Sequence, residues 1–505
     1  MLKTQIINVE NFERIEELEF DSSRKMMSTL NNVENKKIQY TKGAYDRIIK
    51  KCKYIRLDGK NELLTSQYVE KINKEIDRQA NKARRILAFA YKENVEKISE
   101  ENLVFLGFVT FIDPPRNGVK EAVERFRKAG VKTIMITGDY VKTAYAIGQE
   151  IGIVNSEDEC ISGEELDELS DEEMVEIVEK KLVFARVNPQ HKARIVNALK
   201  ENGRIVAMTG DGVNDAPSLK KADIGISMGI NGSDVAKEAS DMILLDDDFS
   251  TIEIAIEEGR TIYNNIKKSV LFLLSSNFAE IIVMILAIVL GLPLPLLAIH
   301  ILIVNLLTDS IPALALGADT KDPDVMKLPP RNSNETLFAN GGLSNTIIYG
   351  VLIALLTMIS FLLPSIQECL YYGASFNLKN IKVILENDNI LLESQTYAFI
   401  VLSLSELFYS LSIRNINKRT FNKTMFKNRV LNSAICGGIA MTLAIIYIPF
   451  LKDVLNFSFV PTGVFAILMA LSASIIVIHD IVYPLVSHET PNLGESDRNR
   501  QKKQK

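Results

Sequence analysis

The sequence predicts an α/β soluble part followed by an all-α membrane bundle of six helices. Roughly the first 260 residues are rich in charge, and strand-like runs alternate there with helical ones, as in a parallel α/β sheet. Beyond that point, long apolar runs are separated by short polar loops, which is typical of several membrane spans. The net charge of −5 is small for 505 residues, so the composition does not favour nucleic-acid binding.

The first 112 residues show strand patterns around one helical stretch. Residues 18–20 and 38–41 alternate like strands, and residues 104–109 are typical of a buried strand. Residues 66–90 have helical periodicity. An aromatic side chain and a few cations would complete a nucleotide pocket here, because adenine needs a flat face and phosphates need positive charge.

Residues 113–250 alternate between strands and helices. The segment Asp113-Pro114-Pro115-Arg116 predicts a stiff connector, because proline fixes φ; a simple linker is the alternative. A strand over residues 132–136 opens into Thr137-Gly138-Asp139, where a hydroxyl ahead of a helix is well placed to hold a phosphoryl oxygen. The alternation is completed by helices over 118–129 (closed by Gly130) and 192–201, and by strands over 182–185, 205–208, 223–228 and 242–245.

The loop Met208 to Ser218 follows one of these strands and carries two carboxylates, Asp211 and Asp215. The glycines on either side of Asp211 permit tight turns and a close approach of the backbone to a ligand. One or two carboxylates beside phosphate oxygens are the usual ligands of Mg²⁺. The loop therefore predicts a Mg²⁺-assisted phosphate site, with a surface turn rich in Asp and Gly as the alternative.

The second half of the chain predicts a long helix and five further spans. Residues 251–290 turn from charged to apolar and would extend over about 60 Å, twice a bilayer core. The later spans are residues 296–316, 345–363, 396–411, 430–450 and 460–482. Six spans place both ends on one side, and the Lys and Arg clusters between spans predict that this side is cytoplasmic. We expect insertion from these internal segments, because the N-terminus lacks the apolar core of a signal peptide.

Polar groups inside the predicted spans suggest a cation site, because such groups are costly in a membrane. Carboxylates, amides and a hydroxyl suit Ca²⁺ far better than Zn²⁺ or Cu⁺, and the chain has no Cys-Pro-Cys motif. The alternative is that these groups only join helices by hydrogen bonds. The candidate residues are Asn277, Glu280, Asn305, Thr308, Asp309 and Glu406.

Five segments in order resemble the motifs of P-type cation-transporting ATPases, with the calcium pumps as the most similar branch. They are Lys42-Gly43-Ala44, Asp113-Pro114-Pro115-Arg116, Thr137-Gly138-Asp139, the loop at 208–218, and Asn305-Leu306-Leu307-Thr308-Asp309. The resemblance implies part of a nucleotide-binding domain, a haloacid-dehalogenase-like (Rossmann-type) phosphorylation domain and a membrane region. The corresponding ranges are 1–112, 113–250, 251–290 for the stalk and first span, 291–485 for five further spans, and 486–505 for a cytoplasmic tail.

The resemblance also implies roles for single residues in ATP chemistry. Phe20 would stack on adenine, Lys25, Lys42 and Gly43 would line the pocket, and Arg85, Asp113 and Arg116 would approach the nucleotide. Thr137, Gly138, Asp139, Arg186, Lys192, Asn214 and Asp215 would surround the phosphorylated site, with Lys192 neutralising the aspartyl-phosphate and Asp211 binding Mg²⁺. The sequence departs from the family at Tyr45-Asp46, where the family commonly has Pro-Glu.

The resemblance predicts ATP-driven transport of a cation, with Ca²⁺ expected and Mn²⁺ still open. In this family the six polar residues of the spans are ion ligands. The family phosphorylates an aspartate in an Asp-Lys-Thr-Gly-Thr segment, and this sequence contains no Asp-Lys-Thr. The expected partners are therefore membrane lipid, ATP and the cation, and the sequence leaves open whether a separate chain supplies the N-terminal half. The alternatives are a truncated or split-gene membrane protein that binds nucleotide or cation without turnover, and a dehalogenase-like phosphatase.

Overall fold

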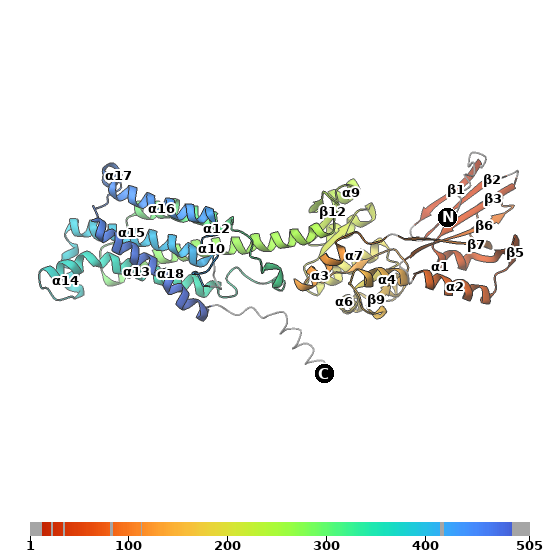
Figure 1. The fold of residues 1–505 in the computed structure, drawn as a ribbon, viewed down its shortest axis with the longest axis horizontal. Coiled ribbons are helices and arrows are strands. Elements are labelled where there is room, and N and C mark those ends of the chain that lie inside the picture. Colours follow the sequence, from red (N-terminus) through yellow and green to blue (C-terminus); the bar gives the residue numbers. More distant parts are fainter. Residues whose placement is uncertain are drawn as a thin grey trace, which may run out of the picture. The chain divides into compact units, whose positions relative to one another are not determined.

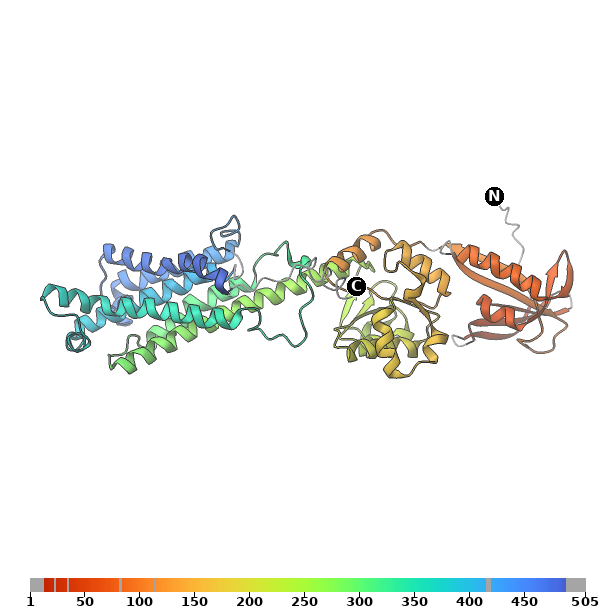
Figure 2. The same cartoon turned by 90° about the horizontal axis from the view of Figure 1, so that it is seen from below.

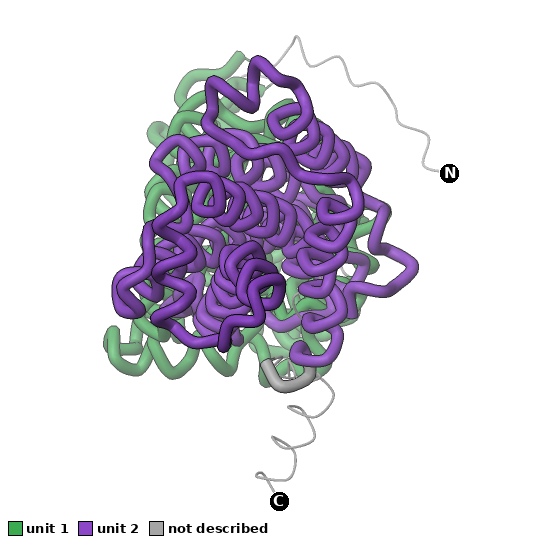
Figure 3. The backbone as a smooth tube through the Cα atoms, turned by 90° about the vertical axis from the view of Figure 1, so that its left-hand side faces the viewer, with its two compact units in different colours: residues 1–253 green, residues 254–505 purple. Residues whose placement is uncertain are grey.

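The computed structural model describes residues 13–21, 24–33, 36–80, 84–112, 114–414 and 419–486. The chain divides into two compact units, Met1–Glu253 and Ile254–Lys505, which Figure 3 shows in two colours. Each unit is described by itself.

The N-terminal part of the first unit is a seven-stranded sheet with the order β1-β2-β3-β6-β7-β4-β5. Neighbouring strands are antiparallel except β4 and β7, which are parallel. Helices α1 (Tyr45–Lys51) and α2 (Ser66–Ala80) share one hydrophobic core with β4, β6 and β7 (Figure 1). The strands are β1 (Glu13–Asp21), β2 (Met26–Val33), β3 (Lys36–Gly43), β4 (Cys52–Leu57), β5 (Lys60–Leu63), β6 (Arg84–Glu93) and β7 (Leu103–Ile112).

The three strands predicted here are confirmed within β1, β3 and β7, but the helix predicted over residues 66–90 is too long. It ends at Ala80, and Arg84–Glu93 forms β6 instead. Ala88 and Ala90, two good helix formers, are buried in this strand between β3 and β7. Hydrogen bonding to strands on both sides outweighs the local preference for a helix, which is worth only about 0.5 kcal/mol per residue.

The rest of the first unit contains two parallel three-stranded sheets, with the orders β8-β10-β9 and β11-β12-β13. The predicted parallel pairing is confirmed, although it is divided between two sheets. The strands are β8 (Met135–Ile136), β9 (Cys160–Ser162), β10 (Val183–Ala185), β11 (Ala207–Gly210), β12 (Ile224–Met228) and β13 (Met242–Leu244). The helices are α3 (Val119–Lys128), α4 (Val141–Glu150), η2 (Glu157–Glu159), α5 (Gly163–Asp167), α6 (Asp171–Lys180), α7 (Pro189–Glu201), η3 (Val213–Asp215), α8 (Ala216–Lys221) and α9 (Asp234–Glu238).

Helix α7 begins three residues before its predicted start. Asn188 caps it by accepting a hydrogen bond from the His191 backbone N–H at 2.9 Å, and proline is favoured at the first helical position. His191 is 3% exposed, and its Nε2 lies 2.6 Å from the Asp167 carboxylate. His191 is therefore a packing residue at the start of α7.

Among the residues that the structure describes, six helices are long and apolar enough to cross a membrane; five lie entirely in the second unit and the first begins four residues before it. Figure 2 shows their bundle. The first is α10 (Ser250–Leu290), within one residue of its predicted start. The second is a composite of α11 (Ala298–Ile303), the π-helix η4 (Val304–Asp309) and α12 (Ser310–Gly317). The others are α13 (Gly342–Tyr371), α15 (Asp388–Ile413), α16 (Arg429–Tyr447) and α18 (Thr462–Val486), with the short η5 (Val325–Lys327), α14 (Leu378–Leu385) and α17 (Pro449–Val454) between spans.

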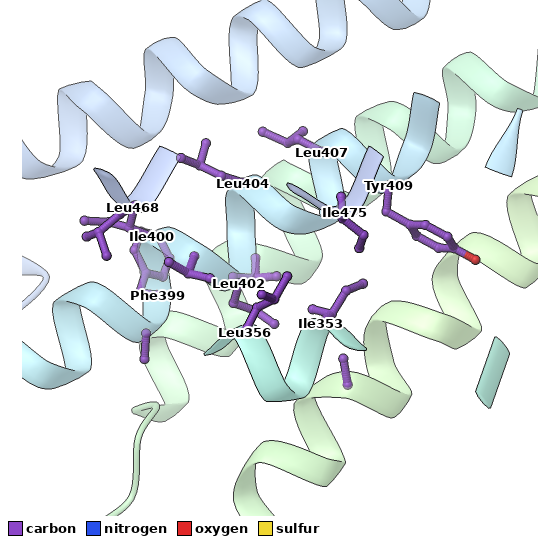
Figure 4. Packing of buried hydrophobic residues seen from close by; sticks show 14 of the residues in the cluster. Ile353, Leu356, Phe399, Ile400, Leu402, Leu404, Leu407, Tyr409, Leu468 and Ile475 are labelled. Atoms are coloured by element: carbon purple, nitrogen blue, oxygen red, sulfur yellow. The ribbon is translucent and has the colours of Figure 1, made fainter. Parts of the chain in front are cut away.

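Helix α15 is the centre of this bundle. Of its most apolar stretch, 94% of the residues are buried, against 33% for α10 and α18. Figure 4 shows its side chains packed against Ile353 and Leu356 of α13 on one side and Leu468 and Ile475 of α18 on the other. A helix buried all round has no lipid-facing side, so any polar group on α15 must face another helix.

Candidate phosphate and cation sites

The loop after β11 is built around the buried carboxylate of Asp215. One carboxylate oxygen lies 2.6 Å from the Lys192 ammonium. The other accepts hydrogen bonds from the backbone N–H groups of Asp211 (3.3 Å) and Gly212 (3.2 Å). A Cβ on Gly210 would lie 2.5 Å from the Cβ of Asp215, so only glycine fits beside this carboxylate. Asp215 therefore acts as the internal support of the loop.

Asp211 and Asn214 have exposed side chains on the outside of the same loop. The Asp211 carbonyl accepts a hydrogen bond from the Ser233 N–H at 2.8 Å, which fixes the backbone and leaves the carboxylate to solvent. No three His, Cys, Asp or Glu side chains converge as a metal site among the residues that the structure describes. One exposed carboxylate is nevertheless what Mg²⁺ needs when phosphate oxygens and water supply its other ligands, so Asp211 fits this ion.

The Thr137-Gly138-Asp139 segment lies at the carboxyl end of β8 and is bonded to the end of β10. The Thr137 N–H donates to the Phe184 carbonyl at 2.8 Å, and the Arg186 N–H donates to the Asp139 carbonyl at 3.1 Å. The Thr137 hydroxyl lies 3.0 Å from the Asp139 carboxylate. The same carboxylate pairs with the Arg85 guanidinium at 3.0 Å, so the structure brings Thr137, Asp139 and Arg85 together.

A cavity of about 260 Å³ lies beside this segment. Its charged lining consists of Arg85 with Asp139 and of Arg186 with Asp46, which form two ion pairs. Its aromatic lining is Tyr45, Phe111 and Tyr140, with the Arg186 guanidinium 6.0 Å from the Tyr140 ring centroid. Burial raises the pKa of Tyr45 to about 12. The cavity combines flat rings with cations, the two features that a nucleotide requires.

Lys25 supports this cavity from outside. Its ammonium donates to the Arg186 carbonyl at 3.2 Å, and burial, followed by the Arg186 charge, lowers the pKa of Lys25. Both Lys25 (φ 55°) and Arg186 (φ 55°) have left-handed backbone conformations, which are uncommon outside glycine and frequent near functional sites.

The other residues predicted to bind nucleotide lie away from the cavity. Phe20 is 64% exposed on β1, and Lys42 is exposed on β3. Gly43 belongs to the β2–β3 ladder, where a Cβ would lie 2.5 Å from the Lys25 carbonyl oxygen. Arg116 donates a hydrogen bond to the Asp247 carbonyl, and Asp113 lies outside the described residues.

Sequence reasoning missed Asp46 and Tyr140 as cavity residues. Asp46 was visible only as a departure from the family pattern, and the structure shows it paired with Arg186, 140 positions away. The pairing depends on how α1 lies against the end of β10, which no local pattern specifies.

The second group of candidates is a carboxylate cluster inside the membrane bundle. Asp309 and Glu406 are both 0% exposed, and Glu280 is 6% exposed. The Glu406 carboxyl interacts electrostatically with both others. Among the described residues, the carboxyl oxygens of Asp309 and Glu406 have no hydrogen-bond partner. Burying a charge without a partner costs on the order of several kcal/mol, so this cluster suits a bound cation.

The π-helix η4 positions Asn305, Thr308 and Asp309. The Asn305 amide donates to both Glu280 carboxylate oxygens, at 3.0 and 3.2 Å. The Thr308 hydroxyl donates to the Val304 carbonyl at 2.9 Å, which leaves its lone pairs for another donor or a cation. π-Helical turns are rare and often mark functional sites, and sequence reasoning had no signal for this one.

Asn277 does not join this cluster. Its side chain is exposed and donates to the Leu273 carbonyl at 2.7 Å, although it was one of the six candidate ligands. Ser276 is the α10 residue that lies inward, since it is fully buried, and its hydroxyl, like the Asp309 carboxyl, has no hydrogen-bond partner among the described residues. Its spacing of four residues from Glu280 was a signal that could have identified it.

These features define an integral membrane protein with an α/β part and a cluster of buried polar groups inside its helices. The family "P-type ATPase, cytoplasmic domain N" matches residues 3–118, and "Cation transporting ATPase, C-terminus" matches residues 293–484. The chain belongs to the P-type cation-transporting ATPases, and within them it resembles the calcium pumps.

Three relatives illustrate the similarity. The calcium-transporting ATPase 1 of Bacillus cereus is 46% identical over 475 residues, covering 93% of this chain and 53% of the relative. The calcium-transporting ATPase of Bacillus subtilis is 41% identical, covering 92% and 51%. The human calcium-transporting ATPase type 2C member 1 is 36% identical, covering 94% and 49%. The chain spans about half the length of the curated relatives it matches.

Proposed function

We propose that this chain works as part of an ATP-driven pump that transports Ca²⁺ across a membrane through an aspartyl-phosphate intermediate. The observation that carries the proposal is the pair of fully buried carboxyls, Asp309 and Glu406, whose oxygens have no hydrogen-bond partner among the described residues. The names of the relatives, all calcium-transporting ATPases, support Ca²⁺ as the ion.

The cation would be held by oxygen atoms from three helices. Asp309 and Glu406 supply charge, and Thr308 supplies a hydroxyl oxygen, which is a ligand set that suits Ca²⁺. Glu280 and Asn305 are already joined by hydrogen bonds, so their positions at one side of the site would be fixed before the cation binds. Asn277 would take part only if α10 rotated or another element covered its exposed face. Release of the ion requires the three helices to have a second arrangement with weaker coordination.

The soluble part would carry out phosphoryl transfer. ATP would occupy the cavity beside Arg85 and Arg186, with Phe20 and Lys42 reached by movement of the sheet that carries them. Transfer would form a bond between the γ-phosphorus and an aspartate oxygen and break the bond between the γ-phosphorus and the bridging oxygen, which leaves with ADP. Thr137 would donate to a phosphoryl oxygen, and Lys192 would move from Asp215 toward the charge that develops there. Asp211 would hold Mg²⁺, which supplies charge neutralisation.

The aspartate nucleophile would come from outside these 505 residues, since the sequence contains no Asp-Lys-Thr. A place for it is suggested by the two parallel sheets. β8 and β11 are both edge strands in the part of the chain that the structure describes, and Ile136 and Met208 from them share one hydrophobic core. A strand added between them would complete one haloacid-dehalogenase-like sheet, with its carboxyl end beside Thr137 and Asp211.

The domain division and orientation remain parts of this proposal. Residues 1–112 would belong to a nucleotide-binding domain and 113–250 to the phosphorylation domain, followed by the stalk at 251–290 and the spans to 485. Both termini and the soluble part would be cytoplasmic, which agrees with the positive-inside rule.

The deciding experiment measures ⁴⁵Ca²⁺ binding to the full chain in lipid nanodiscs. We expect saturable binding that Asp309→Asn and Glu406→Gln each abolish, whereas Glu386→Gln, a change of an exposed carboxylate between spans, leaves it intact. Equal binding by all four proteins would refute the cation site. Competition with Mn²⁺ in the same assay shows which of the two ions is preferred.

The alternative function is binding of nucleotide and cation without turnover, which the lack of an Asp-Lys-Thr segment favours for this chain by itself. Acid-stable labelling by [γ-³²P]ATP separates the two. We expect no labelling of the chain alone. Calcium-dependent labelling of the partner polypeptide is expected after co-expression with the N-terminal half of the Bacillus cereus relative.

A further inference from the structure

A buried ion pair connects two of the helices that carry the carboxylate cluster. The pair lies about two to three helical turns along these helices from the cluster, and we call the two positions the two levels of the bundle. Arg414 follows the last residue of α15, and Asp319 follows α12. The Arg414 Nε lies 2.8 and 3.0 Å from the two Asp319 carboxylate oxygens. Both side chains are almost fully enclosed, with 6% and 3% of their surfaces exposed. Such a pair is costly to bury, so its presence calls for a reason other than stability.

The third helix of the cluster joins the same pair. On α10, the Asn265 amide donates to the Asp319 carbonyl at 2.8 Å, and the Lys268 ammonium lies 3.7 Å from the Asp319 carboxylate. Arg414 in turn donates to the Thr424 and Met425 carbonyls, in the segment that leads to α16. The Thr320 N–H completes the set by donating to Asp319 at 2.8 Å. All these interactions meet at one end of the bundle.

The two levels involve the same three spans. Glu280, Asp309 and Glu406 lie on α10, on η4 just before α12, and on α15. Lys268, Asp319 and Arg414 lie on or directly after α10, α12 and α15. Asp319 is ten residues beyond Asp309 and Arg414 is eight beyond Glu406, so each helix spans about 12–15 Å between the levels.

We propose that Asp319 and Arg414 are positioning residues, whose ion pair fixes the register of the Asp309 helix against the Glu406 helix and so sets the geometry of the cation site. Within the cluster, the Asn305–Glu280 hydrogen bonds join η4 to α10, but the carboxyl oxygens of Asp309 and Glu406 have no hydrogen-bond partner among the described residues, so they provide no such link between the Asp309 and Glu406 helices. A directional link outside the cluster is therefore needed to keep the ligands apart yet in range. Holding register is also the best-attested use of a buried ion pair.

The proposal is tested by hydrogen–deuterium exchange of the full chain in nanodiscs, read at residues 304–309 and 403–407. D319N/R414Q removes both members of the short ion pair together, so neither of these two is left as a buried charge without its partner, and thermal unfolding of the variant checks that the fold is preserved. We expect exchange at 304–309 to become about ten-fold faster, because the π-helix loses its fixed neighbour. R414K keeps the charge but loses part of the fork of donors, so its exchange should lie between those of the unchanged protein and the neutral pair.

The matched control is the exposed pair of Lys327 with Asp324, 2.8 Å apart on the loop that follows α12. D324N/K327Q should leave exchange at 304–309 unchanged. Unaltered exchange in D319N/R414Q would overturn the proposal, as would R414K exchanging as fast as the neutral pair.

The link to transport rests on the proposed function. If Ca²⁺ slows exchange at 304–309 in the unchanged protein, D319N/R414Q should weaken its apparent affinity about ten-fold. An absence of any Ca²⁺ effect in the unchanged protein counts against the Ca²⁺ site alone, since the register test needs no ion.

Discussion

The two units of this protein each bury carboxylates, but they treat them in opposite ways. In the first unit, Asp215 accepts from the Lys192 ammonium and from two backbone N–H groups. In the second, Asp309 and Glu406 are more deeply buried, and none of their oxygens has a hydrogen-bond partner among the described residues. A satisfied carboxylate supports a loop, whereas an unsatisfied one leaves its charge available to a ligand.

In both units, the residues that support the site differ from the residues proposed to bind the ligand. Asp215 holds up a loop on which the proposed Mg²⁺ ligand, Asp211, is exposed. In the membrane bundle the proposed cation ligands are buried, and the Asp319–Arg414 ion pair joins the ends of two of their helices. In our proposals, the supporting and binding residues are thus separated in both units, by four residues in one and by two or more helical turns in the other.

The largest expected effect comes from neutralising Asp309. Asp309→Asn removes the charge that holds the cation, so Ca²⁺ affinity should fall at least about 100-fold, while thermal stability without Ca²⁺ should stay level or rise. Calcium binding and thermal unfolding in nanodiscs measure the two quantities. A loss of stability as large as that of Asp215→Asn would break the comparison between the two carboxylates.

Asp215→Asn should have the opposite effects: the stability of its loop should fall, whereas Ca²⁺ affinity should stay unchanged. It leaves Lys192 without its charge partner and weakens two backbone hydrogen bonds, at a cost of about 2 kcal/mol. Hydrogen exchange over residues 207–218 reports this directly, and Asp211→Asn, four residues away on the exposed face, is the matched control. Slow exchange in both variants would show that the loop does not depend on Asp215.

Gly210→Ala tests the same support by steric means. The new methyl would lie 2.5 Å from the Asp215 Cβ, so the loop must shift, at a cost of roughly 1–3 kcal/mol. Gly212→Ala is the matched control, because the nearest atom to its Cβ is 3.7 Å away. Equal rates of exchange over residues 207–218 in the two variants would show that the contact between Gly210 and Asp215 does not limit the stability of the loop.

The smallest effect concerns Lys25. Its pKa is lowered in the folded protein, so the unfolded chain holds this proton more tightly, and stability should rise with pH between the lowered pKa and the ordinary value of 10.5. Lys25→Met should flatten this part of the stability profile. Denaturant titrations at several alkaline pH values measure it, and the control Lys42→Met, a change of an exposed lysine on β3, should leave the profile as in the unchanged protein.

Sequence reasoning succeeded where one local pattern carried the information. The six spans, the long helix α10 and the loop at 208–218 were all recovered, because length, hydropathy and paired Gly and Asp residues are properties of short segments. It failed at β6, where Ala and Leu suggested helix, because pairing with β3 and β7 decided the outcome. It also expected Asn277 to lie inward with Glu280, whereas Ser276 does.

The sequence by itself determined which residues are candidates for binding a cation and a phosphate, since ionisable side chains are costly in apolar spans and loops after strands of α/β sheets are common phosphate sites. Only the tertiary structure decided which of them are left without partners. Lys192 reaches Asp215 and Asn305 reaches Glu280 across 23 and 25 positions of sequence, and Arg414 reaches Asp319 across 95. Hydrogen bonding depends on distance in space to within a few tenths of an ångström, and packing between elements fixes that distance.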